Sequence, residues 1–189
     1  MRIILLILLF FLLSGSTPQK YNVPAKESVL RESYKILVAQ VGVKEEGENR
    51  GKKIYEYQKT VGIPPGAPYC AAGQYYCFKM AVQNLNLDEN AIPIKKTGLA
   101  NEIFNDAKKK GEKVEYKPFI HDLIVWRRGK TIFGHIERIV EVFGYGWVKT
   151  IAFNTNNGNE AGVFYKKRNI YHPLQQMAIV GLVGFNRHE

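Results

Sequence analysis

The sequence predicts one α+β domain in which helices come first along the chain and an antiparallel sheet follows. Its 189 residues, 46% of them apolar, are enough to build a single globular core. Apolar side chains recur at helical spacing in the first half of the chain. From Tyr116 onward, runs rich in Val, Ile, Phe and Tyr alternate with glycine, asparagine and charged turns, which is typical of strands. Helices followed by strands in this order favour an α+β fold.

Four helices are expected in the first part of the chain. They cover residues 28–41, 52–61, 70–85 and 97–109. Glycine follows three of these segments, at positions 42, 62 and 111, where a helix commonly ends. The turn Pro64-Pro65-Gly66 separates the second helix from the third, and Thr97 is a suitable cap for the fourth.

Five strands are expected in the second part. They cover residues 122–126, 135–142, 147–153, 163–167 and 177–185. The links over residues 127–131 and 143–146 are short enough for antiparallel hairpins. The strands are therefore expected to form an antiparallel sheet that curls around one core.

Residues 1–16 have the features of a signal peptide. Met1-Arg2 makes a charged start, and the apolar run from Ile3 to Leu13 is shorter than the roughly 20 residues that a membrane-spanning helix needs. Ser14-Gly15-Ser16 supplies small residues for a cleavage site before Thr17. We therefore expect a secreted, periplasmic or cell-envelope protein with no stable membrane span after cleavage. An uncleaved membrane anchor is the alternative.

The chain is strongly basic, with a formal net charge of +10. For an exported protein this charge favours an anionic envelope polymer as partner, rather than nucleic acid, because long-range attraction speeds the encounter with such a polymer. Two runs concentrate the charge, Lys108-Lys109-Lys110 and Lys166-Lys167-Arg168. For either run alone, a solvated face is the simpler explanation.

The two cysteines, Cys70 and Cys77, are expected to be free thiols. If both lie on one helix, their Cα atoms are roughly 10 Å apart, beyond the roughly 7 Å that a disulfide spans. Cys70 follows the turn Gly66-Ala67-Pro68-Tyr69 at the start of that helix. A thiol there lies at the positive end of the backbone dipole, which favours the nucleophilic thiolate. The alternative for Cys70 is a small buried apolar residue, and this is what we expect of Cys77.

A cysteine nucleophile needs a base, and His135 is the best placed of the four histidines. It follows Gly134 at the start of a predicted strand, which can hold a side chain over a helix end, whereas His172 and His188 are expected at the surface. Asn154, at the end of the next strand, can orient the imidazole, although residues 154–158 also fit an ordinary polar turn. The chain contains no zinc-binding or phosphate-binding motif, so we do not expect metal catalysis.

Five short motifs occur together in a recognisable order. They are Glu46 with Asn49-Arg50-Gly51, Pro68-Tyr69-Cys70-Ala71-Ala72, Asp122-Leu123-Ile124-Val125, Gly134-His135, and Thr150-Ile151-Ala152-Phe153-Asn154-Thr155. In this combination the chain resembles the CHAP and NlpC-like cysteine hydrolases of peptidoglycan. The resemblance spans about residues 41–185 and implies a papain-like fold, with N-terminal helices packed on a curled antiparallel sheet. It divides the mature chain into a helical extension, residues 17–40, and a hydrolase domain, residues 41–189.

The resemblance also implies a reaction. Cys70 is the nucleophile, His135 the general base and acid, and Asn154 the group that orients His135. The substrate is an amide bond in the wall peptide or at its junction with the glycan, which is cleaved through a thioacyl-enzyme without a cofactor. Asn49, Tyr69 and Glu137, which lie in or beside the same motifs, are expected to bind substrate, and the enzyme is expected to be a monomer.

Three departures from the family pattern bear on activity. Ala152-Phe153 stands where relatives commonly have Glu-Gly, so a carboxylate that could hold the imidazolium is missing, and Asn154 is expected to hold it alone. His121 replaces the glycine of a Gly-Asp turn, and Gly73 interrupts an apolar helix at a cost of up to about 1 kcal/mol. The alternative function is therefore a catalytically weak or inactive basic protein that binds the cell wall. An antibacterial effector with the same chemistry is a third possibility.

Overall fold

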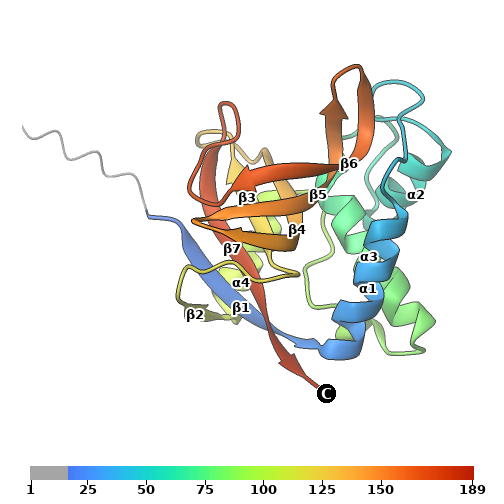
Figure 1. Cartoon of the computed structure of the whole chain (residues 1–189). Coiled ribbons are helices and arrows are strands. Elements are labelled where there is room, and N and C mark those ends of the chain that lie inside the picture. The colour runs from blue at the N-terminus through green and yellow to red at the C-terminus, as the bar shows by residue number, and fades with distance from the viewer. Residues whose placement is uncertain (1–16) are drawn as a thin grey trace, which may run out of the picture.

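The computed structural model describes residues 17–189, so the expected signal peptide lies outside the described residues. Within the described part, no helix combines the length and the apolar character that crossing a membrane requires. The elements are β1 (Gln19–Lys26), α1 (Glu27–Ala39), α2 (Lys52–Val61), α3 (Cys70–Asn84), the 3-10 helix η1 (Glu89–Ala91), α4 (Ala100–Lys110), β2 (Glu112–Val114), β3 (Leu123–Arg127), β4 (Gly134–Gly144), β5 (Trp147–Asn157), β6 (Glu160–Asn169) and β7 (Ala178–His188) (Figure 1). The described residues therefore combine four α-helices with one sheet, as the sequence predicts.

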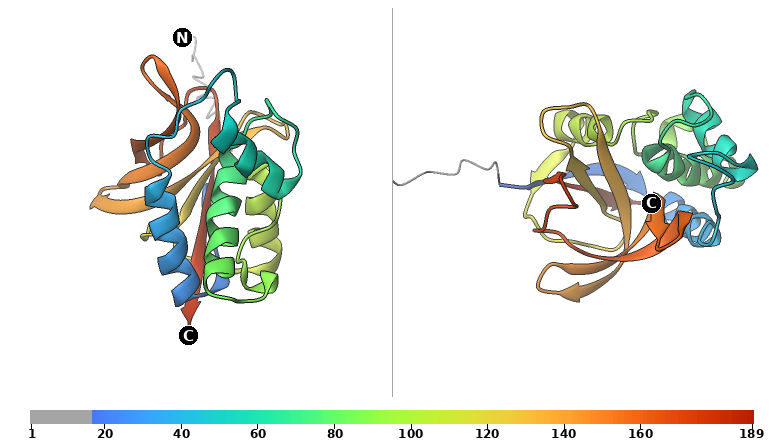
Figure 2. Two further views of the ribbon diagram at one scale, coloured as in Figure 1. Left: turned by 90° about the vertical axis from the view of Figure 1, so that its right-hand side faces the viewer. Right: turned by 90° about the horizontal axis from the view of Figure 1, so that it is seen from above.

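Seven strands form the sheet in the order β2-β1-β7-β3-β4-β5-β6. The strands β3, β4, β5 and β6 are joined in sequence as antiparallel neighbours, and the short links predicted the β3–β4 and β4–β5 pairs. The strand β7 pairs antiparallel with β3. The sheet curls, and α1 and α3 lie side by side (Figure 2). The helix α3 packs against β4 and β5, and α4 packs against β1, β3, β4 and β7. The strand β6 is at one edge of the sheet.

The N-terminal segment is part of the sheet, which corrects the expectation of a purely helical extension over residues 17–40. The strand β1 lies between β2 and β7, and its pairing with β7 is parallel. Tyr21, Val23 and Ala25 alternate toward the core. Pro24 in the same run weakens the strand signal in the sequence. The strand β2 pairs only with residues 20–22 of β1, so Pro24, which has no N–H group to donate, lies beyond the end of β2.

The helix α3 is enclosed by the rest of the fold. It packs beside α1 and α2 and against β4 and β5, and every residue from Cys70 to Phe78 is buried. Both cysteines are free, as predicted, and Cys77 is fully buried in the core. Enclosure on all sides explains the unexpected glycine within this helix, because the Phe153 ring lies directly on Gly73. A Cβ atom added at this glycine would be 2.2 Å from the Phe153 ring.

We expect Gly73→Ala to destabilise the fold although alanine is the better helix former. The added methyl group has no space beside Phe153, and overpacking of this kind costs about 1–3 kcal/mol. Urea unfolding followed by circular dichroism measures the loss. Gln83→Ala, at an exposed position of the same helix, is the matched control and should change stability by no more than about 0.5 kcal/mol. Equal stability of Gly73→Ala and the wild-type protein would contradict the packing argument.

Candidate active site

The first side chain of the site is Cys70, the first residue of α3. Tyr69 precedes it in a non-helical conformation and offers no side-chain cap. The N–H groups of a first helical turn have no partner within the helix, so they can donate to a group bound beside the thiol. The Cys70 Sγ atom lies 4.0 Å from the Gly134 carbonyl oxygen, and this contact joins the helix end to the beginning of β4.

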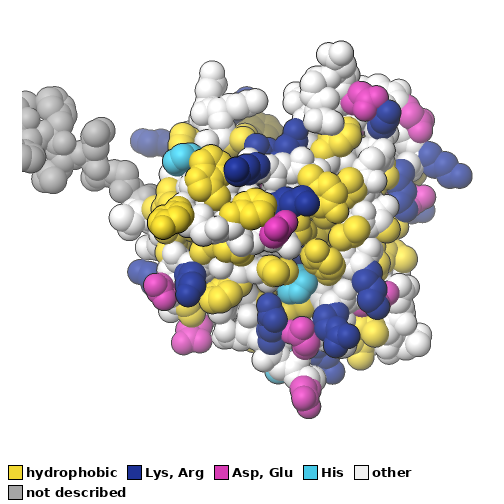
Figure 3. All heavy atoms as spheres, viewed as in Figure 1, with side chains coloured by type: hydrophobic (Ala, Val, Ile, Leu, Met, Phe, Trp, Pro, Cys, Tyr) yellow, Lys and Arg dark blue, Asp and Glu magenta, His cyan; other side chains and the backbone are white. Residues whose placement is uncertain are grey.

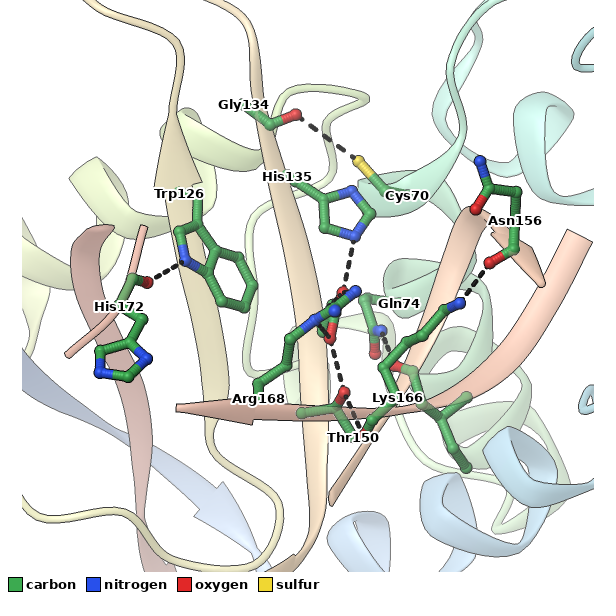
Figure 4. A network of polar contacts seen from close by, with 12 residues as sticks. Cys70, Gln74, Trp126, Gly134, His135, Thr150, Asn156, Lys166, Arg168 and His172 are labelled. Carbon is green, nitrogen blue, oxygen red and sulfur yellow. Dashed lines mark hydrogen bonds and ion pairs between the residues drawn. The ribbon is translucent and has the colours of Figure 1, made fainter. Parts of the chain in front are cut away.

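The second side chain, His135, lies at the beginning of β4, opposite Trp126 on β3. Its ring stands between the Cys70 thiol and the carboxylate of Glu137 (Figure 4). The Nε2 atom is 3.1 Å from the Glu137 Oε1 atom, and Nδ1 lies on the side of the ring that faces the thiol. The fold therefore brings Cys70 and His135 together, although they are far apart in the sequence.

The third side chain is Glu137, two residues after His135 on the same strand. Successive side chains of a strand point to opposite faces, so residues 135 and 137 share one face. Glu137 is fully buried and accepts hydrogen bonds from Thr150 Oγ1 at 2.5 Å and from Arg168 Nη2 at 2.7 Å. The Nε atom of Arg168 lies 3.0 Å from both carboxylate oxygens. These partners hold the carboxylate rigidly against the imidazole.

The pKa values of this pair are shifted in opposite directions. Burial lowers the pKa of His135, but the side chains of Cys70 and Glu137 outweigh it and raise this pKa to about 10. Burial raises the pKa of Glu137, but His135 and Arg168 outweigh it and lower this pKa to about 2. At neutral pH the site therefore holds an imidazolium beside a carboxylate.

The shift of Glu137 makes a prediction about acid stability. A depressed carboxylate pKa contributes stability above the unfolded pKa of about 4.5, and this contribution is lost as the pH falls toward about 2. Glu137→Gln should therefore be less stable than the wild-type protein at pH 7, and the difference should shrink as the pH falls from about 4.5 to 2. Urea unfolding at several pH values measures it. A constant difference across this range would contradict the assignment of the low pKa.

The structure does not bring Asn154 to the place predicted for it. The Asn154 Nδ2 atom donates to the Asn49 Oδ1 atom and lies 3.4 Å from the Glu45 Oε1 atom, whereas the imidazole is held by Glu137. The expectation that no carboxylate holds the imidazolium is therefore wrong. Glu137 was expected to bind substrate, but it is fully buried and its oxygens are occupied. The spacing His-x-Glu within a predicted strand was the signal that could have identified its place.

The other predicted site residues converge on Glu45, which the sequence did not single out. Tyr69 is fully buried and donates from its hydroxyl to the Glu45 Oε1 atom at 2.9 Å, so it supports the site from below the surface. Burial is the largest cause that raises the pKa of Tyr69. The backbone N–H of Asn49 donates to the Glu45 Oε2 atom at 2.6 Å. Glu45 thus ties the loop before α2 to the end of β5.

A pocket of about 390 Å³ opens beside His135. Glu45 and Glu48 lie in its lining together with the basic residues Lys166 and Arg168, so the pocket contains groups of both charges. The remaining lining residues are Asn49, Asn154, Thr155, Asn156, Ala161, Leu174, Gln175 and Met177. Burial, followed by the charge of Arg168, lowers the pKa of Lys166. Positive charge is therefore crowded at the basic side, where an anionic group would be stabilised.

Within residues 17–189, no group of three or more His, Cys, Asp or Glu side chains is arranged to hold a metal ion.

The other histidines lie away from Cys70. His172 and His188 are exposed, as expected. His121 is buried beside the Arg138 guanidinium, and burial and this charge lower its pKa to about 3. His121 is therefore neutral and acts as a hydrogen-bond acceptor for Arg138.

Comparisons with known proteins add no neighbour. No protein-family model, no curated protein and no solved structure matches the chain. The resemblance to cysteine peptidoglycan hydrolases stays a prediction from the sequence motifs.

Proposed function

We propose that this protein is an exported cysteine hydrolase that cleaves amide bonds in peptidoglycan. The observation that carries the proposal is the position of the His135 ring, between the thiol at the start of α3 and the buried Glu137 carboxylate. A nucleophile, a base and a group that orients the base are the parts that acyl transfer requires. The peptidoglycan substrate, the papain-like fold and the export are supported by the sequence motifs and the N-terminal apolar run.

The reaction begins with Cys70 as thiolate and His135 as imidazolium. The sulfur attacks the amide carbonyl carbon, and the oxyanion that forms is stabilised by N–H groups at the start of α3. The Nδ1 proton of His135 passes to the leaving nitrogen, the C–N bond breaks, and an amine departs from the thioacyl-enzyme. His135 then takes a proton from water, whose oxygen attacks the thioester and releases the carboxylate product and Cys70. Glu137 remains ionised throughout and keeps the ring in place.

The pocket beside His135 supports a short peptide bearing both charges as substrate. Wall peptides carry carboxylate groups and amino groups close together along a short chain. An amino group would lie near Glu45 and Glu48, and a carboxylate near Lys166 and Arg168. The amide side chains of Asn49 and Asn154 could donate to peptide carbonyl groups between them. In this proposal Asn154 contributes to binding, and its position in the pocket lining supports that role.

The test is digestion of purified peptidoglycan by the purified mature protein. We expect new amine ends to appear with time, and mass spectrometry of the products identifies the bond that is cleaved. Gel filtration of the same preparation tests the expected monomer. Absence of any new amine end with intact, folded protein would contradict the proposal.

The alternative of an inactive wall-binding protein is less well supported. Its main argument was Ala152, which replaces a carboxylate of the family pattern. Glu137 supplies a carboxylate to the imidazole from a different strand position. The chemical parts of the reaction are therefore complete, and we retain the enzyme as the proposed function.

A further inference from the structure

A surface separate from the reacting groups combines exposed aromatic rings with lysines. We call it the aromatic–lysine face and define it by Phe143, Trp147, Tyr165, Lys149 and Lys167. The Nζ atom of Lys167 lies 5.1 Å from the centre of the Trp147 ring and 5.9 Å from that of Phe143. The Nζ atom of Lys149 lies 4.5 Å from the centre of the Tyr165 ring. The three aromatic residues are between 39% and 50% exposed, so their rings are available to a ligand.

Strand pairing gathers these residues on one face. Lys149 of β5 is paired with Lys167 of β6, and Tyr165 is two residues before Lys167, so all three side chains share a side of the sheet. Trp147 lies two residues before Lys149, and Phe143 is near the end of β4 in the hairpin that joins β4 to β5. On the side of the molecule shown in Figure 3, hydrophobic side chains lie beside Lys and Arg side chains over the β4–β5 region.

The basic run over residues 166–168 is divided between this face and the pocket. Because side chains alternate along β6, Lys166 and Arg168 point to the side of His135, while Lys167 points to the aromatic rings. A small hollow of about 160 Å³ is lined by Trp147, Lys167, Arg168 and Leu174, among others. Arg168 and Leu174 also line the pocket beside His135. The pocket and the aromatic–lysine face are thus adjoining parts of one surface around the edge strand.

We propose that the aromatic–lysine face binds the glycan strand of an anionic polysaccharide. The apolar faces of sugar rings stack on exposed aromatic rings, and ammonium groups between the rings pair with carboxylates on the sugars. The net charge of +10 is complementary to such a polymer. Lys149 already lies 3.9 Å from the carboxylate of Glu141, so Lys167 is the lysine of this face that we expect to contribute most. The identity of the polysaccharide as peptidoglycan rests on the proposed function. The lysines would pair with sugars whose carboxylates carry no peptide, while the peptide of a neighbouring sugar enters the pocket beside His135.

The test measures binding without turnover. The full chain carrying Cys70→Ala is mixed with glycan strands from which the peptides have been removed, and the free protein is quantified after sedimentation or by titration. Adding Trp147→Ala or Lys167→Gln should weaken binding at least tenfold. Tyr55→Ala and Lys108→Gln remove an exposed aromatic ring and an exposed lysine elsewhere, and should leave binding within twofold. The Lys167→Gln variant keeps the proposal testable should Trp147→Ala fail to fold.

Two outcomes would overturn the proposal. One is equal binding of the Trp147→Ala and Lys167→Gln variants and their parent. The other is tighter binding of a DNA oligonucleotide than of glycan strands under the same salt, since that would show a site selective for phosphate charge. Failure of the proposed function is distinguishable, because the binding assay needs no reaction. Glycan binding that depends on Trp147, in a protein that releases no amine ends, would support the face and reject the hydrolase.

Discussion

We expect that replacing Cys70 with alanine abolishes the release of amine ends from peptidoglycan. The substitution removes the sulfur atom that forms the thioacyl-enzyme in the proposed reaction, so we expect a fall in kcat/KM on the order of 10⁴-fold or more. The fold should survive, because the side chain is small and occupies the start of α3 rather than its interior. The measurement is the rate of amine release per folded protein, with folding checked by circular dichroism.

Cys77→Ala is the matched control for this experiment. Cys77 lies two turns further along the same helix, fully buried, and burial raises its pKa to about 12. It is therefore a neutral thiol at the pH of the assay and has no access to substrate. We expect kcat/KM within about threefold of the wild-type value and a loss of stability of about 1 kcal/mol. Equal rates for the wild-type and Cys70→Ala proteins would reject a cysteine hydrolase.

Glu137→Gln should reduce kcat and shift the pH profile of the reaction. The carboxylate stabilises the imidazolium, so its removal lowers the pKa of His135 from about 10. In the proposed reaction, activity should be lost as the pH rises through this pKa, because His135 then carries no proton to donate to the leaving nitrogen. We therefore expect the alkaline limb of the profile to move to lower pH, and kcat to fall on the order of 10²-fold. Rates measured from pH 5 to 11 test both effects.

Two controls separate a role in positioning His135 from a general loss of structure. Thr150→Val removes one hydrogen bond to Glu137 but leaves the His135–Glu137 contact, so its alkaline limb should stay in place. Asn154→Ala removes the group that the sequence predicted as the orienting partner, and we expect a higher KM with an unshifted limb. A shift of the limb in Asn154→Ala, and none in Glu137→Gln, would assign the orienting role to Asn154 after all.

The sequence alone predicted most of the local structure, and it singled out the two side chains, Cys70 and His135, that the structure brings together. Each expected helix and strand is present, because apolar spacing and glycine or proline punctuation are local properties of the chain. Cys70 and His135 were chosen from their positions at the start of a helix and of a strand. Such positions are also local, so their chemistry could be inferred before their distance was known. The free state of both cysteines followed from helix geometry in the same way.

Only the tertiary structure decided which side chains meet. The strand β1 was missed because its partners, β2 and β7, come much later in the chain, and Pro24 weakens its local signal. From the sequence, Glu137 was expected to bind substrate and Asn154 to lie against the imidazole. In the structure Glu137 contacts the imidazole and Asn154 lies in the pocket lining. This arrangement depends on how β4 and β5 pair, and on Arg168 of β6, which holds the carboxylate. Pairing register and burial arise from contacts between segments that are distant in the sequence. A sequence can therefore show which residues suit a site, but only these contacts decide which of them meet.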